Sequence, residues 1–176
     1  QSQRMKKLII DLVELSKVSS GNVEAEITQL DATEAVTQAL GEFADKLDRA
    51  QLIPVFRQPD NDMYMMADGR LVWRVLSNVL SNAVKYALPG TRLYVDVLRL
   101  DGKVLISMKN VSRTELNVSA EELMERFVRG DKSRNTDGSG LGLSIAKSLA
   151  ELQNGSMELT VDGDLFKATV IFDIIK

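Results

Sequence analysis

The sequence predicts an α+β fold, a two-layer α/β sandwich in which helices cover one face of a mixed, mostly antiparallel sheet, plus an N-terminal helix. Two Asp-Gly dipeptides, at 101–102 and 162–163, each separate two apolar-rich runs and therefore predict tight β-hairpins. Helical patterns are mixed with these hairpins, which argues against a parallel doubly wound sheet. The 176 residues suffice for one domain with an appendage.

The appendage is expected at the N-terminus. Residues 2–17 predict an amphipathic helix, because apolar residues recur there at spacings of three and four. These apolar residues are Met5, Leu8, Ile9, Leu12 and Leu15. The stretch 19–22 breaks the helix, so we divide the chain into residues 1–20 and residues 21–176. Residues 23–30 are expected to be a connection with some strand character.

The second unit is predicted to begin with a helix over residues 31–50, where Asp31 and Glu34 have the form of a capping box. Residues 53–57 and 63–66 are predicted strands, separated by a turn-rich stretch.

A longer helix is predicted from Asp68, its capping residue, to about Ala87, just before Pro89 and Gly90. Its interior face is expected to contain Leu71, Val75, Leu76, Val79, Leu80 and Ala83.

The remaining elements follow the same patterns. Residues 93–100 and 103–108 form the first predicted hairpin, and residues 157–161 and 165–174 form the second. A helix between the hairpins is marked by regularly spaced apolar residues and ends at Asn154-Gly155.

The segment before that helix, residues 119–138, is predicted to contain a short helix and a loop. Ser119 and Glu122 form a second capping box and predict a short helix. The charged run 126–138 has no periodicity, and we expect it to be a mobile loop.

Composition excludes several kinds of site. The net charge of −3 argues against a nucleic-acid-binding protein, and no apolar run is long enough to span a membrane. The chain contains no cysteine, which excludes disulfides and thiolate metal sites. It also contains no histidine, which excludes imidazole bases, histidine metal ligands and phosphohistidine on this chain.

Four polar residues follow one stripe of the helix that starts at Asp68. Asn78 and Asn82 are four residues apart, and Lys85 and Tyr86 come one turn later on the same stripe. Amide oxygens suit a hard cation such as Mg²⁺, and neutral amides leave its charge available to phosphates. The stripe therefore predicts a magnesium–nucleotide site.

A glycine run opens the next helix. Gly138, Gly140 and Gly142 leave bare backbone N–H groups at the positive end of a helix dipole, which favours phosphate binding. The residues before the run are not a strand, and no GxxxxGK[ST] motif is present, so neither a Rossmann nor a P-loop site is indicated.

Each motif also has an explanation that involves no ligand binding. An asparagine pair in a helix is more often a capping or solvated feature, and short glycine strings also occur in ordinary loops. The basic residues of the expected loop, Arg126, Arg129, Lys132 and Arg134, are compatible with a solvated surface. Against this, both asparagines adjoin apolar neighbours on a helix expected to be largely buried, where an unpaired amide is costly.

Taken in order, these motifs resemble those of the catalytic ATP-binding domain of bacterial sensor histidine kinases, within the ATPase class that includes gyrase, the Hsp90 chaperones and the mismatch-repair ATPases. Residues 73–86 resemble the N box of that family, residues 125–134 its F box, and residues 138–146 its second glycine box. The resemblance implies ATP and Mg²⁺ as cofactors, and a lid over about residues 111–140.

The resemblance also implies a role for each matching residue. Asn82 would be the Mg²⁺ ligand and Asn78 would support it, while Lys85 and Tyr86 would face the phosphates and the nucleotide. Arg129 would reach the γ-phosphate. The lid's end would pass close to the phosphates at Gly138, Gly140 and Gly142, with the N–H groups of Leu141 to Leu143 as donors.

One motif departs from the family pattern. The family usually has Asp-x-Gly-x-Gly after a strand, whereas residues 110–114 of this chain contain no glycine. Asn110 can accept a hydrogen bond from an adenine amino group, but its own NH₂ group requires a further partner.

Residues 1–20 resemble the second helix of the family's dimerisation and phosphoacceptor hairpin. The resemblance implies a homodimer, a response regulator as partner, and a cytoplasmic domain of a membrane-bound bacterial sensor. An exposed stripe of Met5, Leu8, Ile9 and Leu12 would pack in a four-helix bundle and cause weak self-association.

The first hypothesis is a protein histidine kinase that transfers the γ-phosphoryl of Mg-ATP to a histidine outside this chain, in signal transduction to a response regulator. The alternative is a nucleotide-binding regulatory module with little or no kinase activity, motivated by the altered glycine box. An ATP-driven clamp ranks lower, because Asn78 and Asn82 are both amides where such proteins have a catalytic carboxylate. Scaffolding alone would leave the amides and glycines unexplained.

Overall fold

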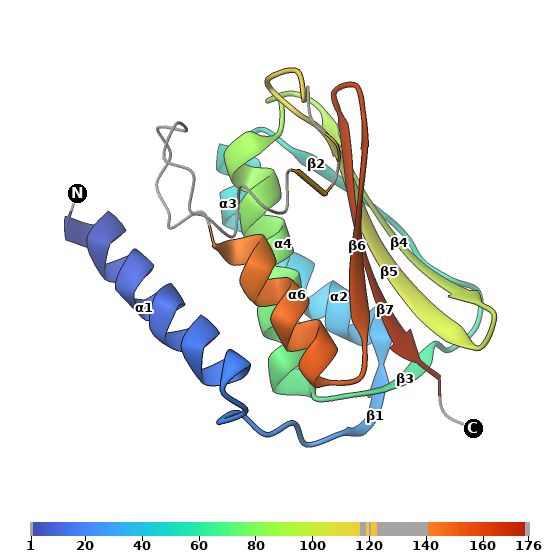
Figure 1. The fold of residues 1–176 in the computed structure, drawn as a ribbon. Coiled ribbons are helices and arrows are strands. Elements are labelled where there is room, and N and C mark those ends of the chain that lie inside the picture. Colours follow the sequence, from blue (N-terminus) through green and yellow to red (C-terminus); the bar gives the residue numbers. More distant parts are fainter. Residues whose placement is uncertain (1, 117–118, 120, 123–140, 175–176) are drawn as a thin grey trace.

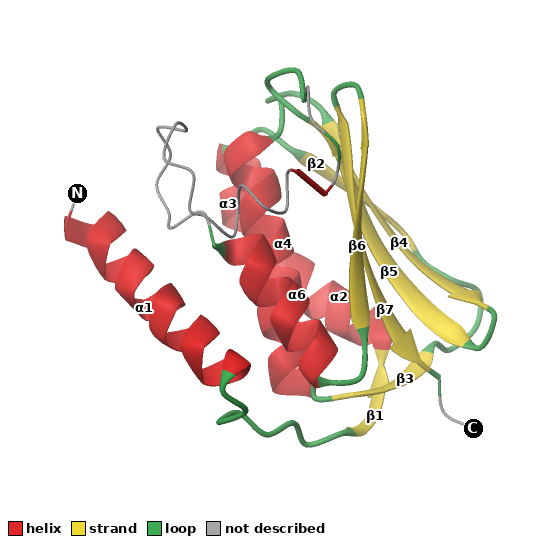
Figure 2. Ribbon diagram, viewed as in Figure 1, coloured by secondary structure: helices red, strands yellow, loops and turns green. Residues whose placement is uncertain are grey.

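A computed structural model describes residues 2–116, 119, 121–122 and 141–174 of the chain (Figure 1). A five-stranded sheet forms one layer, and helices pack on one of its faces (Figure 2). The predicted two-layer α+β fold is therefore confirmed.

The five-stranded sheet has the order β2-β4-β5-β7-β6, in which β2 and β4 are parallel and all other neighbours are antiparallel. Its strands are Ile53–Arg57 (β2), Arg92–Leu100 (β4), Lys103–Val111 (β5), Ser156–Asp162 (β6) and Leu165–Asp173 (β7). Both predicted hairpins are present, as β4–β5 and β6–β7. Their turns place Gly102 at φ 77° and Gly163 at φ 61°, a conformation that glycine adopts at little steric cost.

The described helices are Ser2–Ser19 (α1), Ala32–Glu42 (α2), Ala44–Arg49 (α3), Gly69–Tyr86 (α4) and Gly142–Leu152 (α6). Figure 1 shows α2, α4 and α6 against one face of the sheet, with α1 beyond α6 on the far side from the strands. A separate two-stranded sheet pairs Thr28–Asp31 (β1) with Tyr64–Ala67 (β3).

One predicted segment differs from the structure and another agrees with it. The helix expected over residues 31–50 is divided at Phe43, which ends α2 and precedes α3. Gly41 lies in the last turn of α2, where its low helix propensity favours an interruption. The connection expected at 23–30 has the predicted strand character at its end, where β1 begins at Thr28 and pairs with β3.

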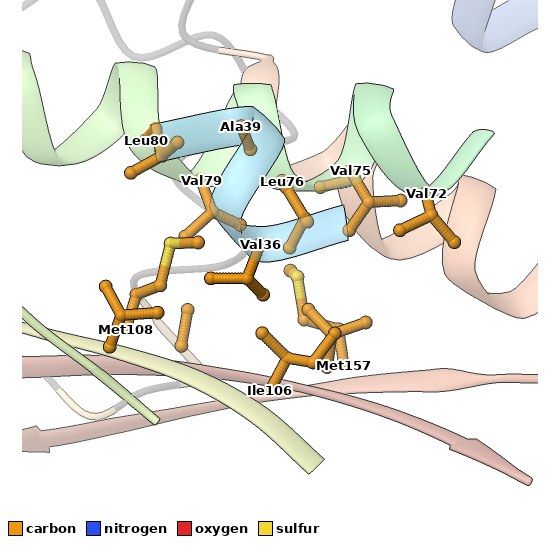
Figure 3. Close-up of a cluster of buried hydrophobic side chains, with 14 of the residues drawn as sticks. Val36, Ala39, Val72, Val75, Leu76, Val79, Leu80, Ile106, Met108 and Met157 are labelled. Atoms are coloured by element: carbon orange, nitrogen blue, oxygen red, sulfur yellow. The ribbon is translucent and has the colours of Figure 1, made fainter. Parts of the chain in front are cut away.

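The core lies between α4, α2 and the inner face of the sheet. Figure 3 shows Val79 and Leu80 of α4 above Met108 of β5, with Val36 of α2 nearby. The predicted interior residues of α4 are all buried: Leu71, Val75, Leu76, Val79, Leu80 and Ala83. Because this apolar face is fixed against the sheet, the opposite face of α4 is turned toward α6 and solvent.

α1 packs against α6, although it shares no sheet or hairpin with the main body. Leu8, Leu15 and Val18 contact the core, which corrects the expectation that Leu8 belongs to an exposed stripe. Met5, Ile9 and Leu12 are exposed at 58%, 53% and 49%, as expected for the rest of that stripe.

Charged groups also hold α1 in place. Glu14 of α1 forms an ion pair with Arg74 of α4, and Asp11 is buried and ion-paired with Lys7 at 3.0 Å. Burial lowers the pKa of Arg74 from its usual value, while the Asp11 carboxylate acts in the opposite direction. The Asp11 carboxylate therefore helps to keep this half-buried guanidinium charged.

Arg74→Met should loosen α1 from the main body. Glu14 Oε1 is buried without a hydrogen-bond partner among the described residues, and the substitution would also remove the cation beside that carboxylate. We expect amide hydrogen exchange in α1 to accelerate about 5- to 150-fold, which corresponds to about 1–3 kcal/mol for a buried polar group left unpaired. The matched control is Arg49→Met on the surface of α3, which removes the same charge. Equal exchange rates in the two variants would show that the ion pair does not hold α1.

Candidate functional site

The two asparagines and the start of α6 lie next to each other. Asn78 and Asn82 are half-buried on α4. A Cβ atom built on Gly142 would lie 3.7 Å from Oδ1 and 4.0 Å from the backbone O of Asn78. The fold thus brings the asparagine stripe and the end of the glycine run together, although 64 positions separate Asn78 from Gly142 (142 minus 78).

The carboxamides of this stripe are available to a ligand. In the part of the chain that the structure describes, the side chains of Asn78 and Asn82 have no hydrogen-bond partner. Unpaired, half-buried amides carry a desolvation cost that a ligand's polar groups can offset.

The first turn of α6 supplies the second group of polar atoms. Leu141 is the N-cap residue and makes no side-chain capping hydrogen bond. The first N–H groups of a helix have no partner within that helix, so they remain potential donors. The side chains of Leu141 and Leu143 are buried at 2% and 1% exposure, and they anchor this turn to the core.

Asn110 lies at the neighbouring end of β5. It is 4% exposed and shares the inner face of the strand with Met108 and Ile106. The next inward residue, Ser112, pairs with Ala87 just after α4, so Asn110 lies beneath the C-terminal part of that helix. Its side chain has no hydrogen-bond partner among described residues, and its polar atoms are not fully sealed from solvent. A ligand between α4 and β5 can therefore reach it.

Lys85 and Tyr86 occupy the last turn of α4, and both are half-buried. Arg113 binds the same turn, because its backbone N–H donates to Tyr86 O at 2.8 Å and its Nη2 donates to Lys85 O. A cation at the C-terminus of a helix satisfies free carbonyls and interacts favourably with the dipole. Arg113 was not identified from the sequence, since only the fold brings the end of β5 beside this turn.

A second contact that was not predicted from the sequence fixes α4 relative to α6. The backbone N–H of Asp68 donates to Gln153 Oε1 at 2.8 Å, and Gln153 Nε2 donates to Leu149 O at 3.0 Å. Asp68 in turn caps α4, as predicted, by accepting from Arg70 N and Leu71 N. This buried link joins the start of α4 to the end of α6.

Several predicted residues lie outside the described ranges: Arg129, Gly138 and Gly140, together with most of the expected lid and the charged run 126–138. Ser119 Oγ accepts from Glu122 N at 3.1 Å, as the second capping box predicts.

The amide oxygens of Asn78 and Asn82 suit a hard cation that is also bound by the phosphate oxygens of a nucleotide. The described residues contain no group of three or more His, Cys, Asp or Glu side chains that could hold a metal ion. Amide oxygens of Asn78 and Asn82 are appropriate ligands for Mg²⁺, which usually retains waters and phosphate oxygens in its coordination sphere.

No described helix is long and apolar enough to cross a membrane.

Comparison with known proteins gives a family and a set of relatives. The family described as "Histidine kinase-, DNA gyrase B-, and HSP90-like ATPase" matches residues 67–174. The chain is similar to the sensor histidine kinase WalK of Bacillus subtilis (strain 168), with 29% identity over 162 residues, 89% of this chain and 26% of WalK. The chain therefore spans about a quarter of that relative.

Solved structures show the same fold. Full-length ShkA in complex with AMPPNP matches with a TM-score of 0.77 and 18% identity, covering 96% of this chain and 36% of that one. The histidine kinase ThkA in complex with the response regulator protein TrrA matches with a TM-score of 0.74 and 18% identity, covering 97% of this chain and 49% of that one.

Proposed function

Because the chain belongs to the histidine kinase-, DNA gyrase B- and HSP90-like ATPase family, we propose that it binds Mg-ATP as the catalytic domain of a sensor histidine kinase and delivers the γ-phosphoryl to a histidine. The observation that carries this proposal is the close approach of Gly142 to Asn78, beside carboxamides that have no partner among the described residues. Amide oxygens and helix N–H groups then face one volume, as a metal-bound polyphosphate requires.

We assign the nucleotide contacts as follows. Asn82 holds Mg²⁺ with support from Asn78, and the ion neutralises charge on the phosphates. The first turn of α6, from Leu141 to Leu143, donates N–H groups to phosphate oxygens. Asn110 accepts a hydrogen bond from the adenine amino group.

The remaining predicted residues act on the phosphates. Lys85 and Arg129 stabilise the charge that develops during transfer, and Tyr86 lies against the nucleotide. Gly138 and Gly140 allow the backbone to approach the phosphates closely.

The acceptor must lie on another polypeptide segment, because this chain contains no histidine. An imidazole nitrogen forms a bond to the γ-phosphorus, the bond to the β,γ-bridging oxygen breaks, and ADP leaves. The domain's contribution is to position the reactants and stabilise charge.

The proposed setting is a larger sensor. We assign residues 1–20 to the second helix of a dimerisation hairpin and residues 21–176 to the ATP-binding domain. The exposed Met5, Ile9 and Leu12 would then pack in the hairpin bundle of a homodimer, and a response regulator would receive the phosphoryl group. We place the domain on the cytoplasmic side of a membrane-bound bacterial sensor.

One observation favours the alternative, a nucleotide-binding regulatory module with little or no kinase activity. Residues 110–114 lack the glycines of the family pattern, and Arg113 occupies the C-terminal turn of α4 instead. A segment held in this way has less freedom to rearrange around a nucleotide.

Asn82→Ala should weaken magnesium-dependent nucleotide binding more than about 10-fold, because it removes the proposed metal ligand. The measurement is calorimetric titration with ADP and a non-hydrolysable ATP analogue, with and without Mg²⁺. The control is Asn61→Ala, which removes an exposed amide from the loop between β2 and β3. Binding that is unaffected by Asn82→Ala, or that is absent from the folded wild-type protein, would contradict the proposed site.

Phosphoryl transfer should be detectable with radiolabelled ATP and the histidine-bearing hairpin of the parent kinase. We expect an acid-labile, base-stable label on the hairpin, and we expect Lys85→Ala to reduce its rate by about 10- to 1,000-fold through lost charge stabilisation. Magnesium-dependent binding without any transfer would support the regulatory module, so the two hypotheses are separated.

A further inference from the structure

The outer face of the five-stranded sheet carries a row of aromatic and basic side chains. Tyr94 of β4 pairs with Lys109 of β5, and Lys109 pairs in turn with Lys167 of β7. Their neighbours along each strand are buried against the helices, so these three half-buried residues point to the opposite side of the sheet. No described helix covers this face (Figure 2).

Lys109 and Lys167 are a like-charge pair on adjacent strands, and an anion between them would reduce their repulsion. Like charges directly opposite each other on adjacent strands are destabilising. Lys109 Nζ lies 5.4 Å from the centroid of the Tyr94 ring, and neither lysine forms an ion pair within the described residues. The nearest carboxylate along β4, Asp96, is occupied by both Nε and Nη2 of Arg57, at 2.5 and 2.7 Å.

A hollow adjoins this row. Its volume is about 450 Å³, and its lining includes Arg92, Tyr94, Lys109, Asn110, Val111 and Leu165. Val111 and Leu165 pair directly across β5 and β7, two residues along from Lys109 and Lys167. The hollow therefore places the cationic groups of Arg92 and Lys109 beside a small apolar surface formed by Val111 and Leu165.

The distribution of charge favours a discrete anionic ligand over an extended one. The edge strand β6 presents Glu158 and Asp162 to solvent, whereas Asp173, near the other end of the face, is ion-paired with Lys103 at 2.5 Å. A flat anionic membrane or a nucleic acid would be repelled by Glu158 and Asp162, whereas a short acidic segment can lie beside them. Exposed Leu98, farther along the face, extends the contact area available to apolar side chains of such a segment.

We propose that this hollow is a docking site for an acidic peptide segment of a partner protein. Carboxylates of the segment bind Lys109 and Lys167, and an apolar side chain contacts Val111 and Leu165. Asn110, the residue between Lys109 and Val111, also lines the hollow, so the hollow borders a residue of the proposed nucleotide site, whereas Lys109 and Lys167 lie on the outer face of the sheet.

The test uses a short fluorescein-labelled peptide with glutamates interspersed among leucines and serines, and measures its affinity by anisotropy at low salt. Lys109→Gln/Lys167→Gln should weaken binding at least about fivefold, since two charge contacts are lost. The matched control, Lys17→Gln/Lys46→Gln, removes the same net charge from exposed positions on α1 and α3 and should bind like the wild type.

Three results would overturn the proposal: equal weakening in both double variants, equal affinity for a peptide with lysines in place of the glutamates, or binding to phosphatidylserine vesicles without binding to the peptide. Peptide titration of the isotope-labelled wild type gives a readout without substitutions. Backbone amide shifts should concentrate at Tyr94, Lys109, Leu165 and Lys167, and an absence of shifts there would equally refute the docking site.

Discussion

The packing of α4 against the sheet and beside α6 is the constraint on which the rest of the structure depends. One face of α4 buries an unbroken series of apolar side chains over β5, as Figure 3 shows for Val79, Leu80 and Met108. The link from Asp68 to Gln153 then fixes the helix relative to α6 at its other end. Loss of this packing would separate Asn78 from Gly142, and the proposed site would not exist.

The same packing buries carboxamide groups at a cost in desolvation free energy, which hydrogen bonds to a ligand can offset. Carboxamides at Asn78, Asn82 and Asn110 are half-buried or buried, yet none has a partner among the described residues. A fold selected for stability alone would fill such positions with apolar groups or pair them. Unpaired carboxamides beside the start of a helix that has no side-chain cap are expected where the missing partners belong to a ligand. Arg113 contributes differently, by completing the C-terminal turn that carries Lys85 and Tyr86.

Local sequence patterns were sufficient to predict some elements of the fold but not others. The hairpins follow from Asp-Gly turns, and α4 follows from its cap and its apolar spacing, because these signals act within a few residues. The break at Phe43, the packing of Leu8 against the main body and the role of Gln153 depend on contacts between distant segments. The placement of Asn78 and Asn82 on one stripe was predictable because a helix fixes the relative positions of i and i+4, whereas the position of Arg113 required knowledge of where β5 ends.

The most direct test of the central claim replaces Mg²⁺ by paramagnetic Mn²⁺ in the presence of a non-hydrolysable ATP analogue. NMR line broadening then reports which groups lie near the ion. The account predicts the strongest broadening for the side-chain amides of Asn82 and Asn78 and for the backbone amides of Gly142 and Leu143. Broadening centred on the acidic turns at 60–62 or 162–164, with the two asparagines unaffected, would contradict it.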